Sequence, residues 1–206
     1  MKISLIGMAS VGKSYWSKRF AAAGFVHIDL DDLIRQRLVA KLNRPLSTTT
    51  LMNEWLDYPD SEGFAEREQL FIETEAEVFQ YTLSELEKAE AHIPMIIDTG
   101  GSLVYSPTEY WHRLKQYTTV IHLKIDKSLY KVMANTYLTE GRSVIWKGAY
   151  KPLAGEPRHE SYLRCYAKLV DVRENFYVQY ADCEVAYAQH RDRSMSIDDF
   201  LKLRKN

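Results

Sequence analysis

The segment from Gly7 to Ser14 constrains this chain more than any other, because it fits the pattern G-x-x-x-x-G-K-[ST]. The apolar run Ile3 to Ile6 precedes it, and a helix-like segment follows. Glycines let backbone N–H groups point at phosphate oxygens, while Lys13 reaches the β and γ phosphates and the Ser14 hydroxyl can coordinate Mg²⁺. The sequence therefore predicts a strand, loop and helix that bind a nucleoside triphosphate. The alternative is an ordinary strand-to-helix turn rich in small residues.

Length and composition suit one compact domain that spans residues 1–206. The chain is 46% hydrophobic and 27% charged, which is enough apolar material to bury a full core. The formal net charge of −1 provides no general attraction for nucleic acid or an anionic membrane, so we expect small-molecule partners. Cys165 and Cys183 form no C-x-x-C pair, and we expect neither a signal peptide nor a membrane span. A cytoplasmic monomer or weak homodimer fits these features.

Short apolar or β-branched runs alternate with longer helical stretches, which predicts an α/β fold built on a parallel sheet. One helix is expected from Lys13 to Ala23, with Gly24 as its C-cap, and a long helical region, broken once at most, over residues 62–90. The five expected strands are Lys2 to Ile6, Val26 to Ile28, Met95 to Ile97, Thr118 to Ile125 and Glu184 to Ala188.

Two acidic segments follow predicted strands, at the edge where ligands bind in open parallel sheets. The first is Asp29-Leu30-Asp31-Asp32. If this segment is extended, Asp29 and Asp31 point to the same side, so one carboxylate can hold Mg²⁺ and the other can accept a proton from a substrate hydroxyl. The alternative is a helix N-cap with acidic residues in the first turn.

The second acidic segment is Asp98-Thr99-Gly100-Gly101, directly after the third predicted strand. A carboxylate at Asp98 suits the ligand shell of Mg²⁺, and the paired glycines let a substrate approach the backbone closely. The alternative is a plain turn.

Taken together and in this order, these segments resemble the shikimate kinase family. Lys151-Pro152-Leu153 is similar to the family's lid segment Arg-Pro-Leu, and the run Leu169 to Asp182 matches its pattern R-x-x-x-Y-x-x-x-A-D. The resemblance implies a nucleoside-monophosphate-kinase-like P-loop fold, a three-layer sandwich in which helices flank a five-stranded parallel sheet. It also implies transfer of the γ-phosphoryl group of ATP, with Mg²⁺, to a hydroxyl of a small carboxylic acid, shikimate or a related compound.

The resemblance implies roles for individual residues and segments. An acceptor-binding insertion falls at about residues 33–92 and a lid at about residues 139–156. The residues implied to bind ATP are Gly7, Ala9, Ser10, Val11, Gly12, Lys13, Ser14 and Tyr15. Those implied to hold the metal are Ser14, Asp29 and Asp98, and those implied to act in catalysis are Lys13, Asp31 and the lid cation Lys151. The acceptor is implied to contact Asp31, Gly100, Gly101 and Arg173, whose guanidinium pairs with the acceptor carboxylate.

The chain also departs from the family. A second arginine for the acceptor is expected in an F-R-x-x-E stretch, but Phe71 to Glu75 has Ile72 at that position, and Arg67 lies about one helical turn earlier. Lys151 replaces the lid arginine, which keeps the charge but removes a planar five-donor fork. Arg142 is a candidate to supply a catalytic guanidinium to the phosphates, and a solvent-exposed loop arginine is the alternative.

These departures leave the acceptor open. One alternative is a kinase of the same fold that acts on a sugar acid or a nucleotide, and the other is a nucleotide-binding regulatory module without efficient transfer. Trp55 and Tyr58 precede the long predicted helix and either shape the acceptor pocket or pack in the core.

Overall fold

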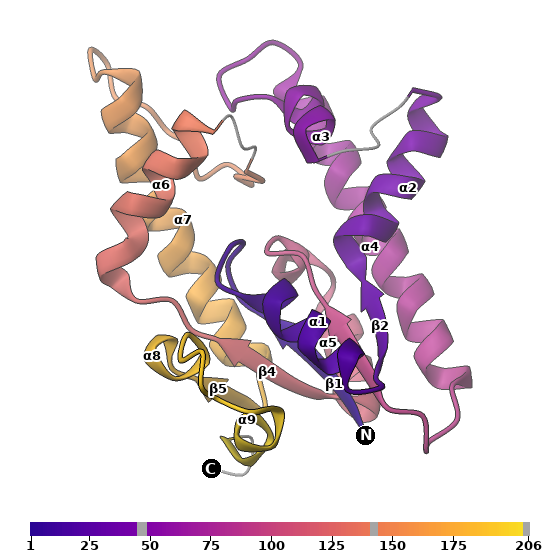
Figure 1. Ribbon diagram of the computed structural model, residues 1–206. Coiled ribbons are helices and arrows are strands. Elements are labelled where there is room, and N and C mark those ends of the chain that lie inside the picture. Colours follow the sequence, from indigo (N-terminus) through magenta and orange to yellow (C-terminus); the bar gives the residue numbers. More distant parts are fainter. Residues whose placement is uncertain (45–48, 141–143, 204–206) are drawn as a thin grey trace.

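The computed structural model describes residues 1–44, 49–140 and 144–203 and contains a sheet of five parallel strands in the order β2-β3-β1-β4-β5 (Figure 1). The predicted parallel sheet is therefore confirmed. Its strands are β1 (Lys2–Ile6), β2 (Val26–Asp29), β3 (Met95–Asp98), β4 (Thr119–Leu123) and β5 (Cys183–Val185). The α-helices are α1 (Lys13–Ala22), α2 (Leu30–Leu42), α3 (Thr49–Leu56), α4 (Phe64–Lys88), α5 (Thr108–Tyr117), α6 (Tyr130–Thr139), α7 (Arg158–Tyr180), α8 (Tyr187–His190) and α9 (Ile197–Leu203). Short 3₁₀ turns, η1 (Leu103–Tyr105) and η2 (Lys127–Leu129), lie between them.

The central strands consist mainly of buried apolar residues, because helices cover both faces of the sheet. In β1, Ile3, Leu5 and Ile6 have no exposed surface, whereas Val26 at the start of the edge strand β2 is 48% exposed. On one face α1 packs against α9, where the rings of Trp16 and Phe200 lie 4.3 Å apart. This burial on both faces is what excludes the strands from water and leaves only their ends free for a site.

On the other face the aromatic residues of α4, α5 and α7 pack together. Trp111 of α5 stacks on Tyr180 of α7 with ring centroids 4.6 Å apart, and its other neighbour is Phe79 of α4 at 5.3 Å. The predicted three-layer arrangement of helix, sheet and helix is therefore confirmed. None of the helices that the structure describes combines the length and apolar character needed to cross a membrane.

Two helical walls rise beyond the carboxyl ends of the strands (Figure 1). Helices α2, α3 and α4 form one wall, and α6 with the upper part of α7 forms the other. The walls are joined where the Tyr58 hydroxyl donates to the Leu138 carbonyl at 3.2 Å. Tyr58 also packs under the guanidinium of Arg158, and Trp55 is 7% exposed within the core, so both aromatic residues serve packing.

The structure corrects two expectations and shows whether the long helix is broken. The segment Asp29 to Asp32 is not extended: Asp29 is the N-cap of α2, and Asp31 and Asp32 lie in its first turn. Acidic side chains are favourable at a helix N-terminus, so the helical alternative prevails. The fifth strand ends at Val185, and the residues expected to prolong it start α8 instead. The long helix α4 is unbroken from Phe64 to Lys88.

Candidate functional site

The loop between β1 and α1 has the backbone shape that its glycines predict. Gly7 and Gly12 have φ values of 141° and 121°, and Ser10 has a φ of 63°. A Cβ atom at Gly7 would lie 2.6 Å from the Leu123 carbonyl oxygen, so only glycine fits between β1 and β4. The loop leads into the N-terminus of α1, where free backbone N–H groups favour an anion.

Lys13 is held within this loop. Its side chain is 6% exposed, and its Nζ donates to the carbonyl oxygens of Gly7 and Met8, each at 3.0 Å. Burial lowers the pKa of Lys13, and the nearby carboxylates of Asp98 and Asp31 oppose that shift. An ammonium group that is buried and surrounded by loop carbonyls is positioned to exchange these contacts for phosphate oxygens.

Two carboxylates meet where β2 and β3 end. Asp29 and Asp98 are direct neighbours in the parallel register of these strands. Asp98 is 4% exposed, and the Ser14 hydroxyl is a hydrogen-bond partner of its carboxylate. Burial raises the pKa of Asp98, while Lys13 opposes the shift. The three residues predicted to hold a metal, Ser14, Asp29 and Asp98, therefore lie together beside the phosphate loop.

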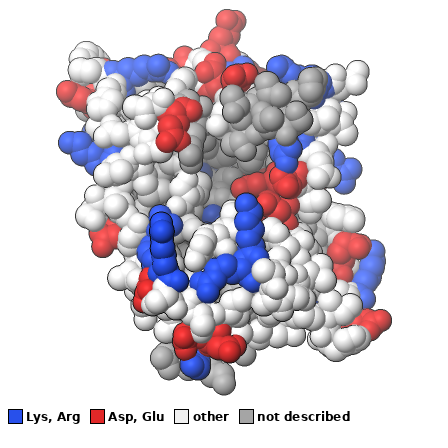
Figure 2. Space-filling view, viewed as in Figure 1, with Lys and Arg blue, Asp and Glu red and all other residues white. Residues whose placement is uncertain are grey.

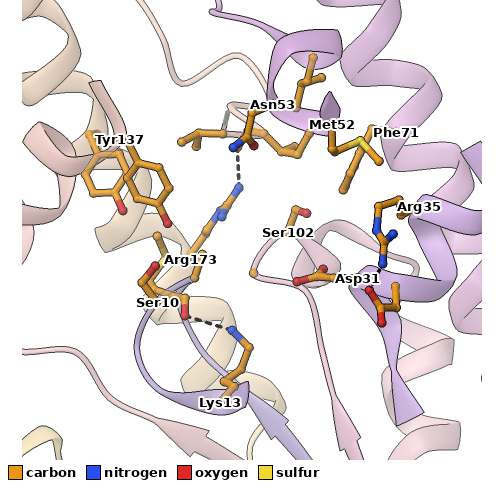
Figure 3. Close-up of a pocket in the computed structure, with 18 residues that line it drawn as sticks. Ser10, Lys13, Asp31, Arg35, Met52, Asn53, Phe71, Ser102, Tyr137 and Arg173 are labelled. Atoms are coloured by element: carbon orange, nitrogen blue, oxygen red, sulfur yellow. Dashed lines mark hydrogen bonds and ion pairs between the residues drawn. The ribbon is translucent and has the colours of Figure 1, made fainter. Parts of the chain in front are cut away.

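Asp31 points into the space between the helical walls (Figure 3). Asp31 is exposed to solvent in the cleft, yet partial desolvation of its carboxylate raises the pKa of Asp31 to about 6, and Lys13 opposes the shift. A carboxylate with such a pKa is largely ionised at neutral pH yet basic enough to accept a proton. Asp29 instead accepts a hydrogen bond from the Asp32 N–H at 3.2 Å, so the two aspartates have separate positions.

A cavity of about 330 Å³ lies between the walls and above the phosphate loop. Figure 2 shows this face hollowed at its centre, with basic side chains along the lower rim and acidic side chains on the right. Polar side chains at the cavity include Lys13, Asp31 and Arg173. The apolar part of its lining includes Met52, Leu56, Phe71, Val144 and Ile145. The cavity therefore offers charged groups near the loop and apolar walls farther out.

Arg173 extends from α7 into this cavity (Figure 3). It is 3% exposed, its Nη2 donates to the Ile145 carbonyl, and its Nε donates to the Tyr105 hydroxyl at 3.3 Å. These contacts orient the guanidinium and point it toward Asn53 of the opposite wall. Arg173 also packs beside Gly101, because a Cβ atom added at Gly101 would lie 3.4 Å from Arg173 Nη1. Two residues predicted to contact the acceptor therefore lie together.

Glu75 is a site residue that the sequence analysis did not identify as functional. It is 1% exposed, and its Oε1 accepts a hydrogen bond from the Ser102 hydroxyl at 2.8 Å. Burial raises the pKa of Glu75 to about 8, with a smaller contribution from Asp31. The sequence offered one indication of its role, because Glu75 is the glutamate of the F-R-x-x-E pattern in Phe71 to Glu75. Only the fold brings its carboxyl group to Gly100.

Other predicted residues are placed elsewhere. Lys151 is exposed and does not line the cavity, and Tyr15 is 45% exposed on α1. Arg67 does not replace the missing arginine, because its guanidinium donates to the Leu56 carbonyl at the end of α3 and to Ser61 and Glu62 in the segment before α4. Arg142 lies outside the described residues. The roles of Lys151, Tyr15 and Arg142 therefore stay predictions.

The arrangement is similar to solved structures of shikimate kinases. The enzyme from Bacteroides thetaiotaomicron has a TM-score of 0.59 and 19% identity, with 100% of this chain and 97% of that chain covered. The Acinetobacter baumannii enzyme, in complex with shikimate, has a TM-score of 0.56 and 19% identity, covering 97% of this chain and 87% of that chain. The Aquifex aeolicus enzyme has a TM-score of 0.52 and 18% identity, covering 100% of this chain and 92% of that chain.

No family model and no curated protein sequence matches the chain. The structural matches cover nearly all of it, and they show that the chain has a shikimate kinase-like P-loop kinase fold. At this level of identity the likeness concerns the fold, so the chemistry must be argued from the side chains.

Proposed function

We propose that this protein is an ATP-dependent kinase that transfers the γ-phosphoryl group to a hydroxyl of a small carboxylic acid. The observation that carries the proposal is the convergence of Lys13, Asp31 and Arg173 on one cavity. Each side chain matches one requirement of the reaction: a cation at the phosphates, a base at the alcohol, and a cation at the acceptor carboxylate.

Lys13 neutralises charge on the β and γ phosphates, which the N–H groups of the loop Gly7 to Ser14 surround. Asp31 orients the acceptor hydroxyl and takes its proton while the new O–P bond forms and ADP leaves. Mg²⁺, when bound by Ser14, Asp29 and Asp98, would neutralise the phosphate charge further. The buried oxygen Oδ2 of Asp98 has no hydrogen-bond partner within the described part of the chain, and this supports the ligand role because an unsatisfied buried carboxylate oxygen is costly.

The acceptor is proposed to be shikimate or a related hydroxylated acid with a single carboxylate. Arg173 supplies a guanidinium for that carboxylate, and Ile72 cannot supply a second one. A charge-assisted hydrogen bond contributes about 1.5–3 kcal/mol, so an acceptor that needs two arginines would bind roughly ten- to a hundredfold more weakly here. Phe71 and Met52 add apolar contacts at the cavity wall. These apolar contacts suit the carbon skeleton of such an acid, while the single guanidinium suits its one carboxylate.

The domain organisation completes the proposal. Residues 1–206 form one kinase domain, in which about 33–92 hold the acceptor and about 139–156 close over ATP. The described part of the lid is attached at both ends: Glu68 accepts from the N–H groups of Trp146 and Lys147, and Glu156 pairs with Arg164. A lid that excludes water protects the γ-phosphoryl group from hydrolysis.

A panel of acceptors read out by ADP release tests the proposal. It should contain shikimate, other hydroxylated carboxylic acids, sugar acids and nucleotides. We expect ADP release that depends on a hydroxylated acid and is lost in Lys13→Met, which keeps the aliphatic stem but removes the charge. Stimulation by a sugar acid or nucleotide would favour another kinase of this fold, and tight ATP binding without any acceptor response would favour the regulatory module.

A further inference from the structure

A histidine lies beside the two carboxylates at the end of β2. His27 and Asp29 are two residues apart on this strand, so their side chains share one face. One ligand atom each from His27, Asp29 and Asp98 lies within 4.8 Å of the others. This spacing is suitable for three ligands of a single cation.

Two atoms of this cluster are buried without a partner. The Nε2 atom of His27 and the Oδ2 atom of Asp98 have no hydrogen-bond partner among the residues that the structure describes. Asp98 itself is only 4% exposed. Leaving a buried acceptor unsatisfied is costly, and a cation bound through these two atoms would satisfy both.

The cluster is accessible from outside. His27 and Asp29 line a second, shallow hollow between α1, α2, α4 and the edge strand β2. Asp32 and Glu85 also line it, together with two lysines, Lys18 and Lys88. A cation can therefore reach His27 and Asp29 by a route that does not pass through the acceptor cavity.

We propose that His27, Asp29 and Asp98 form a three-ligand site for a divalent first-row transition cation, which binds there in preference to Mg²⁺. An imidazole nitrogen suits such ions, and affinity rises along the series from Mn²⁺ to Cu²⁺. Mg²⁺ favours an all-oxygen octahedral shell and gives up its waters reluctantly. The inference rests on the proposed function in one respect, the position of the cation beside the phosphates of bound ATP. That position follows from the contact between Ser14 of the phosphate loop and Asp98.

Binding measured without nucleotide or acceptor tests the proposal independently of phosphoryl transfer. Calorimetric titration with Mn²⁺ and with Mg²⁺ should show one site that binds Mn²⁺ at least about tenfold more tightly. The electron spin-echo signal of the Mn²⁺ complex should carry modulation from a directly bound imidazole nitrogen. Equal affinities, or a Mn²⁺ complex without nitrogen modulation, would overturn the proposal.

Two variants of His27 and one control assign the ligand. His27→Gln and His27→Leu should both lose the nitrogen modulation and the preference for Mn²⁺, while Mg²⁺ binding at the remaining aspartates changes little. His112→Gln alters an exposed histidine of α5 and should keep the wild-type behaviour. Far-UV circular dichroism and Tm show that each variant is folded. If the modulation persists in folded His27→Gln, another histidine binds the ion and the proposal is wrong. Because these measurements do not involve phosphoryl transfer, they stay valid even if the protein is not a kinase.

Discussion

The carboxyl groups of Asp31 on α2 and Glu75 on α4 both approach the space where a Cβ atom of Gly100 would lie. A Cβ atom at Gly100 would lie 2.8 Å from Asp31 Oδ1 and 2.9 Å from Glu75 Oε1. Both contacts are shorter than ordinary van der Waals distances. The glycine therefore permits Asp31, the proposed base on α2, and the buried carboxyl of Glu75 on α4 to approach the same point.

Gly100→Ala should disturb this pair directly. Because Glu75 is buried and Asp31 faces the open cavity, the new methyl group should displace mainly Asp31. Misplacing a catalytic group by about 1 Å can cost on the order of 100-fold in rate, so we expect kcat to fall by roughly 10- to 100-fold with little change in the KM for ATP. Steady-state kinetics check this result.

Gly101→Ala provides the contrast for that experiment. Its Cβ would lie 3.2 Å from the Ala9 nitrogen of the phosphate loop, so this variant should raise the KM for ATP as well. A Gly100→Ala enzyme with wild-type kcat would contradict the role assigned to the Asp31 position.

Glu75→Gln should change how stability depends on pH. The pKa of Glu75 is about 8 in the folded protein, against an ordinary value of 4.5, because burial disfavours the charge. The folded state therefore keeps a proton that the unfolded state releases, and stability falls as pH rises from about 4.5 to about 8. Glutamine removes this dependence and retains an oxygen that accepts from Ser102.

The measurement is Tm across this pH range for both proteins. The Tm of Glu75→Gln relative to wild type should rise steadily with pH and level off above about 8. Glu73→Gln, at an exposed position of the same helix, should track the wild type. A constant difference between Glu75→Gln and wild type would show that Glu75 does not hold its proton in the fold.

Arg173→Gln should weaken acceptor binding more than it slows chemistry. The change removes a guanidinium from the cavity, and the loss of one charge-assisted contact corresponds to about a ten- to hundredfold rise in the acceptor KM. The KM for ATP should stay close to that of the wild type. Arg113→Gln, which alters a partly exposed pair with Glu87, is the control. An unchanged acceptor KM in folded Arg173→Gln would remove Arg173 from the acceptor site.

Glu68→Ala should loosen the attachment of the lid to α4. The Glu68 carboxylate accepts from the N–H groups of Trp146 and Lys147, next to the cavity residues Val144 and Ile145. Without this acceptor, both N–H groups should exchange with deuterium faster, and the acceptor KM should rise several-fold because one cavity wall becomes less ordered. Hydrogen exchange followed by mass spectrometry and steady-state kinetics measure the two effects.

Glu73→Ala, on the same helix as Glu68, is the matched control for Glu68→Ala. Glu73→Ala removes an exposed carboxylate that accepts only from Gln69 among the hydrogen bonds described for it. It should leave exchange at Trp146 and Lys147 unchanged. Equal exchange rates in wild type and Glu68→Ala would show that the lid is held by other contacts.

Local patterns in the sequence determined the phosphate loop, four of the strands to within a few residues and the parallel sheet. Their physical basis is short-range: Gly7 and Gly12 are needed for backbone shape, and continuous apolar runs form strands that are buried on both faces. Local patterns gave the wrong conformation for Asp29 to Asp32, because an acidic segment is compatible with an extended strand end and with a helix N-terminus. In the fold Asp29 caps α2 by accepting from the Asp32 N–H, and α2 packs against α4.

What only the tertiary structure decided is which distant side chains meet. Glu75 lies in the middle of a long helix, yet packing brings it to Ser102 and Gly100. The fold likewise binds Arg67 to the Leu56 carbonyl at the end of α3. The meeting of His27 with Asp98 likewise depends on β2 pairing with β3, which are separated by three helices along the chain. Residue type and spacing specify local backbone geometry, whereas contacts between distant segments follow from how the whole chain buries its apolar surface.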